Sequence, residues 1–243
     1  MSKVITVTSG KGGTGKSTVC AGLGYALEKQ GKRVLILELD LGFRCMDIFF
    51  GIEDMVKHDL SSALSGRYTV EDTAVIVPGA EKLSIICSPD NPFINVNSLK
   101  LKKLLTELKE KYEFIIIDTG AGLLKCVLDI ADMIDILLTV ATPDKISIRD
   151  AAKASDKFYE KGCTNQRLVI NKANPDYLNL GLVKSFDEVI DNTGVQLIGV
   201  IPDDKMLAKA FGKDSKLSKN SASFNAFDAI ARRIKGQYVP LTV

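Results

Sequence analysis

The chain alternates short apolar or β-branched runs with longer stretches in which apolar residues recur every three or four positions. The short runs cover residues 4–8, 34–37, 83–86, 114–117, 136–140, 168–170 and 197–201. Helical spacing is clearest over residues 99–108 and 148–158. Strands that are apolar throughout and separated by helices are typical of a parallel sheet covered on both faces. The pattern predicts a three-layer α/β/α fold with a mainly parallel sheet.

Composition narrows the class of protein. The 243 residues include 32 basic and 30 acidic side chains. The net charge is therefore too small to favour binding to nucleic acid or to an anionic membrane. No linker-like or repeated stretch divides the chain, and we expect one domain over residues 1–243. Five cysteines without a C-x-x-C pair argue against a disulfide framework and a tetrahedral metal site. Because we find neither a signal peptide nor an apolar run of membrane-spanning length, we expect a cytoplasmic protein.

A glycine-rich loop, GKGGTGKS at residues 10–17, joins the first apolar run to the first helical stretch. Its spacing is that of a phosphate-binding loop, G-x-x-x-x-G-K-[ST]. Glycines let backbone N–H groups approach a phosphate, and the helix N-terminus that follows favours an anion. The loop therefore predicts a nucleotide site with Mg²⁺. Its additional lysine, Lys11, indicates which class of nucleotide-binding protein the chain belongs to. The candidate nucleotide-binding residues here are Gly10, Lys11, Gly12, Gly13, Thr14, Gly15, Lys16 and Ser17.

Two aspartates follow apolar runs, at the sheet edge where such folds bind ligands. Asp40 can orient or deprotonate water near the γ-phosphate, and Asp118 can bring a carboxylate to the Mg²⁺ shell. Either could instead cap a helix or lie in a loop. Glycines after Asp118, among them Gly120 and Gly122, allow the backbone to approach the γ-phosphate.

Two further strand ends carry weaker signals. Asn171 follows the run 168–170 and can hydrogen-bond the adenine edge. Pro202 and Asp203 follow the run 197–201. Taken alone, either site is more often a turn than a binding residue.

At these residues the chain resembles the MinD/ParA family of deviant Walker A P-loop ATPases, and within it the MinD branch. Residues 11–18, KGGTGKST, match the loop of that family. Residues 38–47, ELDLGFRCMD, resemble the switch I pattern D-x-D-x-G-x-R-N-L-D, and residues 118–122, DTGAG, resemble switch II. Further similar segments at 142–151 and 199–204 extend the resemblance from residue 1 to about 205.

The resemblance implies an ATPase that dimerises around ATP and returns to the monomer after hydrolysis. It implies that Lys11 crosses the dimer and stabilises transition-state charge on the partner's nucleotide, as arginine fingers do. The other implied roles are Lys16 on the β- and γ-phosphates, Thr18 on the α-phosphate, Asp40 on the attacking water, Asn171 on adenine, and Ser17, Asp40 and Asp118 around Mg²⁺. Gly122, Pro202 and Asp203 complete the expected nucleotide site.

Departures from the family pattern fall in the switches. Glu38 replaces the first aspartate of switch I, and Cys45 replaces its asparagine. Gly120 stands where many relatives have proline, which should loosen switch II.

The C-terminal segment predicts a helix over about residues 222–236. Phe224, Phe227, Ile230 and Ile234 lie on one face at helical spacing, and Gly236 ends the pattern. We interpret the helix as docked on the core, although basic flanks beside aromatic residues also suit a lipid surface.

The resemblance favours, as the function, an ATP switch that regulates placement of the cell-division septum. The partners implied are a second copy of the chain, MinC- and MinE-like regulators, and a peripheral membrane contact, with no specific nucleic acid. The alternatives are a ParA-like DNA-partitioning ATPase, an FlhG-like flagellar-positioning ATPase, and a metal- or cluster-carrying relative. The last needs paired cysteines, which the sequence lacks.

Overall fold

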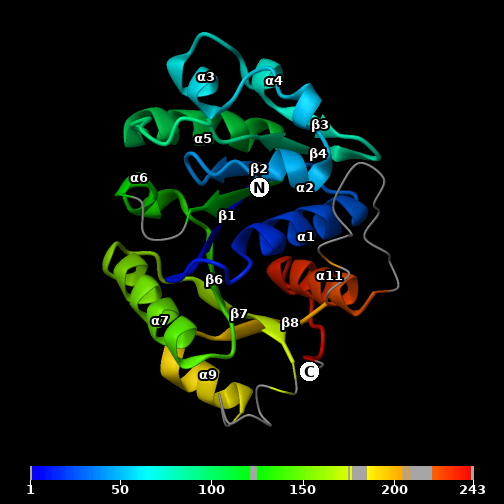
Figure 1. Cartoon of the computed structure of the whole chain (residues 1–243), viewed down its shortest axis with the longest axis vertical. Helices are drawn as coiled ribbons and strands as arrows, with labels where there is room; N and C mark the ends of the chain where they lie inside the picture. Colours follow the sequence, from blue (N-terminus) through cyan, green and yellow to red (C-terminus); the bar gives the residue numbers. More distant parts are fainter. Residues whose placement is uncertain are drawn as a thin grey trace.

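The computed structural model describes residues 2–120, 125–174, 176, 185–204, 207 and 221–241. Its centre is one eight-stranded sheet with the order β3-β4-β2-β5-β1-β6-β7-β8 (Figure 1). The strands are β1 (Lys3–Thr8), β2 (Val34–Leu39), β3 (Val75–Val77), β4 (Ala80–Ile86), β5 (Phe114–Thr119), β6 (Ile136–Ala141), β7 (Gln166–Ala173) and β8 (Leu197–Pro202). Only the β3–β4 pair is antiparallel among these strands, which confirms the predicted sheet.

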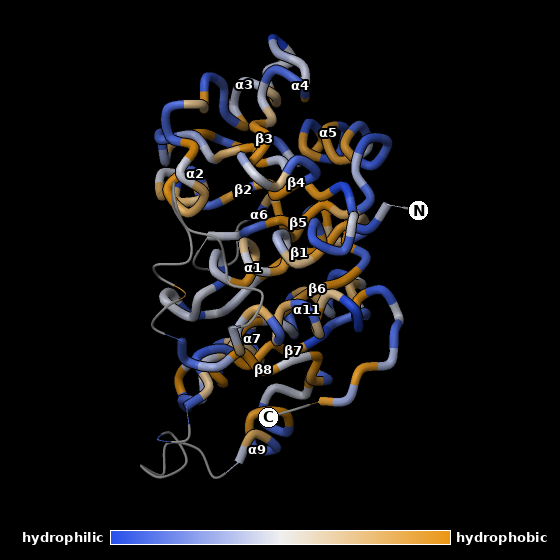
Figure 2. The backbone as a smooth tube through the Cα atoms, turned by 90° about the vertical axis from the view of Figure 1, so that its right-hand side faces the viewer, coloured by the Kyte–Doolittle hydropathy of each residue, from blue (hydrophilic) through white to orange (hydrophobic). Residues whose placement is uncertain are grey.

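Helices cover both faces of the sheet. The described α-helices are α1 (Lys16–Lys29), α2 (Met46–Phe50), α3 (Leu60–Ser65), α4 (Val70–Thr73), α5 (Ser98–Lys111), α6 (Lys125–Leu128), α7 (Lys145–Glu160), α9 (Phe186–Thr193) and α11 (Ala222–Ile234). Residues of α1, α2 and α11 share a core with one sheet face, and those of α3, α5, α7 and α9 pack on the other. Figure 2 shows the hydrophobic colour concentrated on the central strands. The three-layer prediction is confirmed.

Side-chain alternation along the strands decides which residues face the nucleotide loop. Ile36 of β2 and Ile116 of β5 pair with each other and lie in the core shared with α1. Two residues further along, Glu38 and Asp118 form the next pair on that face, because strand side chains alternate with a period of two. The sheet register therefore brings two carboxylates together beneath the start of α1.

The C-terminal helix α11 is docked on the core, as the sequence predicted. Phe227 is fully buried, and its ring lies so close to α1 that a Cβ at Gly22 would meet it at 2.4 Å. Phe224, Ile230 and Ile234 are also buried, so the apolar face of α11 belongs to the protein interior. Among the described residues, no helix has the length and apolar character needed to cross a membrane.

Candidate functional site

The loop between β1 and α1 has the conformation of an anion cradle. Gly15 caps α1 with φ 90° and ψ 30°, and Gly13 also has a positive φ of 79°. A Cβ on Gly15 would lie 2.2 Å from the Asn171 Nδ2, and one on Gly10 would lie 2.0 Å from the backbone oxygen of Asp150. Glycine is therefore required here by conformation and by space. The first N–H groups of α1 lack partners within the helix and can bind a phosphate.

The two lysines of the loop occupy different surroundings. Lys16 is buried, and its Nζ donates a hydrogen bond to the Ser9 Oγ at 3.1 Å, inside the cradle. Lys11 keeps 41% of its side chain exposed and lies 3.5 Å from the Asp144 Oδ1. Burial pushes the pKa of Asp144 up, but bonds from Thr142, the Ser147 amide and Lys11 outweigh it, so the pKa is lowered. Lys11 is thus an accessible cation on the rim, held by an ionised carboxylate.

Asp118 is a fully buried carboxylate with spare acceptor capacity. Cys20 Sγ donates to its Oδ1 at 3.4 Å, whereas its Oδ2 has no hydrogen-bond partner among the described residues. Burial, with the charge of Glu38, raises the pKa of Asp118 to about 7, although Ser17 and Lys16 oppose the shift. An orphaned buried carboxylate oxygen fits a position that faces a cation.

Glu38, the departure from the switch I pattern, organises the turn that leads into α2. Its Oε1 accepts hydrogen bonds from the Cys45 and Met46 amides at 2.7 and 3.0 Å, and its Oε2 accepts one from the Ser88 amide at 3.0 Å. Burial raises its pKa, and these amide donors oppose the rise. This role was not predicted; its only signal in the sequence is a carboxylate at the end of an apolar strand.

Asp40 lies just beyond β2, where the sequence placed it. Its backbone oxygen accepts a bond from the Ser88 Oγ at 2.9 Å, and a Cβ on Gly120 would lie 2.5 Å from its Oδ1. Burial raises the pKa of Asp40, and the Lys16 charge opposes that rise. Gly120 therefore lets the start of switch II approach Asp40. Ala121 and the proposed ligand Gly122 lie outside the described residues.

The end of β7 contacts the loop directly. The Asn171 Nδ2 donates to the Thr14 backbone oxygen at 2.8 Å, and the Lys172 Nζ donates to the Gly13 oxygen at 2.8 Å. Lys172 has a φ of 55° and is the one non-glycine residue with a positive φ among the described residues. A non-glycine backbone in this region is strained, and such strain is concentrated at functional sites. The sequence singled out Asn171 for an adenine contact, which stays a prediction, and did not single out Lys172.

Pro202 and Asp203 lie at the end of β8, next to β7. The Asp203 amide donates to the Ala173 oxygen at 2.9 Å, two residues beyond Asn171. Among the described contacts, the β8 end thus reaches the neighbouring strand, and Asn171 and Lys172 of β7 join this side of the sheet to the loop.

Taken together, the geometry fits a magnesium nucleotide. The glycine cradle and Lys16 suit phosphates, and Ser17 lies in the first turn of α1, where its hydroxyl interacts with Asp118. Hydroxyl and carboxylate oxygens are the ligands that Mg²⁺ prefers. Gly12 is exposed on the same loop, and Thr18 lies one residue beyond Ser17.

Comparisons with known proteins agree with this geometry. Residues 5–217 match the family profile described as the CobQ/CobB/MinD/ParA nucleotide binding domain. The septum site-determining protein MinD of Synechocystis is 30% identical, over 99% of this chain and 92% of that protein. A solved MinC:MinD cell division complex from Aquifex aeolicus contains a chain with a TM-score of 0.90 and 28% identity, covering 100% of this chain and 99% of that one.

A third relative carries a nucleotide. The septum site-determining protein MinD of Pyrococcus horikoshii, solved with Mg-ADP, has a TM-score of 0.83 and 26% identity, and 96% of each chain is covered. Full-length similarity to several MinD proteins favours that branch over the DNA-partitioning, flagellar and cluster-carrying alternatives. The chain therefore belongs to the MinD/ParA family of P-loop ATPases and is a division-site ATPase of MinD type.

Proposed function

We propose that the chain is an Mg²⁺-dependent ATPase whose site is completed by a second copy of itself. The observation that carries the proposal is the difference between its two loop lysines. Lys16 is buried inside the cradle against Ser9, whereas the Lys11 ammonium is accessible on the rim, 3.5 Å from the Asp144 Oδ1. An accessible cation paired with a partly exposed carboxylate is suited to another subunit's phosphates.

The other site residues act on the nucleotide that is bound by their own chain. Lys16, Thr18 and the loop amides bind the phosphates of ATP, Asn171 contacts the adenine, and Gly122, Pro202 and Asp203 contribute to nucleotide binding. Ser17, Asp40 and Asp118 surround the position proposed for Mg²⁺, which, when bound, neutralises charge on the β- and γ-phosphates. Asp40 orients the attacking water, and Gly120 leaves it room to do so.

Lys11 supplies the positive charge that the nucleotide site of a single chain lacks. In the free chain its ammonium is paired with Asp144; in a dimer it leaves this carboxylate for the transferring phosphoryl group of the partner's nucleotide. The contact it gives up is partly exposed, and such pairs are worth only about 0–1 kcal/mol. ATP thereby links two copies, and hydrolysis removes the γ-phosphate that Lys11 contacts.

Separate alanine variants of the two lysines test this division of roles. Lys16→Ala should lose binding of a fluorescent ATP analogue, whereas Lys11→Ala should bind it and remain a monomer in sedimentation velocity with ATP. Asp40→Ala should instead accumulate as an ATP-bound dimer. Lys145→Ala removes an exposed charge from the same rim and serves as the control. A Lys11→Ala protein that dimerises and hydrolyses ATP like the wild type contradicts the proposal.

We further propose that the ATP-bound dimer is the form that meets MinC- and MinE-like regulators and a peripheral membrane surface from the cytoplasm. The support is the similarity to MinD proteins, one of them solved in complex with MinC. The near balance of 32 basic and 30 acidic residues gives no reason to expect specific nucleic-acid binding. Cosedimentation with anionic liposomes and with DNA, in ATP against ADP, separates these surfaces; ATP-dependent retention on DNA alone would overturn the membrane proposal.

A further inference from the structure

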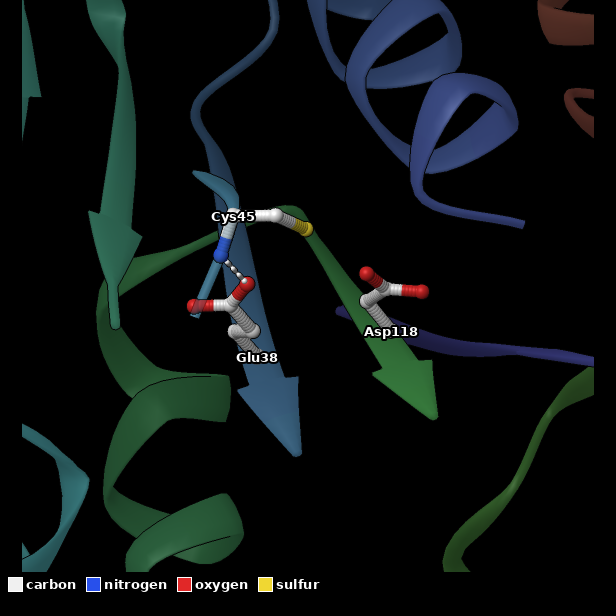
Figure 3. A group of neighbouring side chains, drawn as sticks. All are labelled: Glu38, Cys45 and Asp118. Carbon is white, nitrogen blue, oxygen red and sulfur yellow. Dashed lines mark hydrogen bonds between the residues drawn. The ribbon is translucent and has the colours of Figure 1, made fainter. Parts of the chain in front are cut away.

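The two departures in switch I meet at one place. Glu38 of β2, Cys45 before α2 and Asp118 of β5 each offer a ligand atom, and these atoms lie within 4.8 Å of one another. Figure 3 shows the Cys45 sulfur projecting toward the Asp118 carboxylate, while the Cys45 amide bonds to Glu38. Two carboxylates and a thiol from separate segments are therefore gathered in one buried or half-buried cluster.

The cluster has unused capacity for a cation. Asp118 is fully buried, and its Oδ2 has no hydrogen-bond partner among the described residues. A carboxylate offers about four acceptor positions, and backbone amides use three of those on Glu38. Each carboxylate thus keeps a lone pair available while its position is fixed by the sheet. The amides also fix the backbone at Cys45, so the thiol is held beside both.

The thiol determines which ion fits. Mg²⁺ prefers oxygen ligands, whereas a thiolate selects softer ions such as Zn²⁺ and its spectroscopic substitute Co²⁺. Zinc bonds of about 2.0–2.3 Å place the ligands of one ion roughly 3–4 Å apart. Small side-chain movements would therefore bring the three ligand atoms to bonding distance of one ion. Three protein ligands leave a fourth position for water or a phosphate oxygen.

We propose that Glu38, Cys45 and Asp118 form a binding site for a thiophilic divalent ion of the zinc class. On binding, the Cys45 thiol releases its proton to solvent and the ion takes the place of that proton between the three side chains; no oxidant or reductant is involved. Because Asp118 is shared with the proposed Mg²⁺ position, a thiophilic ion and Mg-nucleotide exclude each other. This last consequence rests on the proposed function, whereas binding of the ion alone does not.

The test uses the full chain free of nucleotide and Mg²⁺. Co²⁺ is titrated while the thiolate-to-cobalt charge-transfer absorption is recorded, and Zn²⁺ affinity is measured by competition with a chromophoric chelator. The variants are Cys45→Ser and Cys45→Asn, the latter restoring the side chain of the MinD-type pattern. Cys126→Ser, at another half-buried free thiol, is the matched control.

The wild type and Cys126→Ser should develop the cobalt absorption and bind Zn²⁺ alike. Both Cys45 variants should lose the absorption and bind Zn²⁺ about tenfold more weakly or worse, since lost ligands cost at least as much as lost supporting groups. Absence of the absorption in the wild type, or its persistence in either Cys45 variant, overturns the site. Added Mg-ADP should bleach the absorption; if it persists, the mutual exclusion is wrong.

Discussion

The buried carboxylate of Asp118 should make the nucleotide-free chain less stable as the pH rises. Burial, helped by the charge of Glu38, raises its pKa from 3.8 to about 7. The folded state therefore holds this proton more tightly than the unfolded state. Its contribution to stability is complete below the unfolded pKa and is lost as the pH rises through about 7.

The size of the effect follows from the same pKa. Each pH unit between the unfolded and folded values is worth about 1.4 kcal/mol. Between about pH 5 and pH 7 the wild type should lose about 2 kcal/mol relative to Asp118→Asn, which cannot ionise, because the loss per pH unit falls as the pH approaches the folded pKa. Any fixed cost of the substitution is the same at both pH values and cancels in this comparison.

Thermal unfolding of both proteins, without nucleotide or divalent ions, measures the difference in stability between the wild type and Asp118→Asn at each pH. For a chain of this size about 2 kcal/mol corresponds to roughly 4–8 °C in Tm. The control is Asp129→Asn. A hydrogen bond from Lys125 lowers the pKa of Asp129, so the contribution of this carboxylate to stability is already complete above pH 3.8. The difference in stability between the wild type and Asp129→Asn should therefore not change with pH. A stability difference for Asp118→Asn that does not change with pH would refute the reasoning.

Two further predictions concern packing and the loop. Phe227→Ala removes a fully buried ring between α11 and α1 and should lower the free energy of unfolding by about 3–5 kcal/mol in urea titrations; a loss below about 1 kcal/mol would mean that α11 is not part of the core. Gly15→Ala should strongly weaken binding of a fluorescent ATP analogue, because φ is 90° and the new Cβ meets Asn171. Gly31→Ala, with φ 82° but open space around it, should bind nucleotide normally, and equal losses in both variants would point to backbone strain alone.

The sequence predicted the sheet well because its strands are buried on both faces. The run 114–117 forms the first four residues of β5, and the segments 99–108 and 148–158 lie within α5 and α7. β3, at residues Val75–Val77, was missed because it is short and its register shifts against β4. An edge strand of this kind carries no periodicity that a sequence can display.

The site was predicted in part. Local spacing was enough for the loop and for the aspartates at strand ends, since each lies beside an apolar run. The hydrogen bonds that Glu38 accepts from amides seven and fifty positions away could not be read from spacing, because they depend on how β2 meets two other segments. The same holds for Lys172, whose contact with Gly13 spans 159 residues.

Mixing two inactive variants tests the central claim, that Lys11 serves the partner's nucleotide, most directly. Lys11→Ala and Asp40→Ala should each hydrolyse little ATP alone. In a mixed dimer the Lys11→Ala subunit keeps its own Asp40 and receives Lys11 from its partner, so one site is complete. The mixture should therefore hydrolyse ATP clearly faster than either component alone, by up to half the wild-type rate per mixed dimer, because each mixed dimer has one complete site of two. A mixture as inactive as its components would contradict the account.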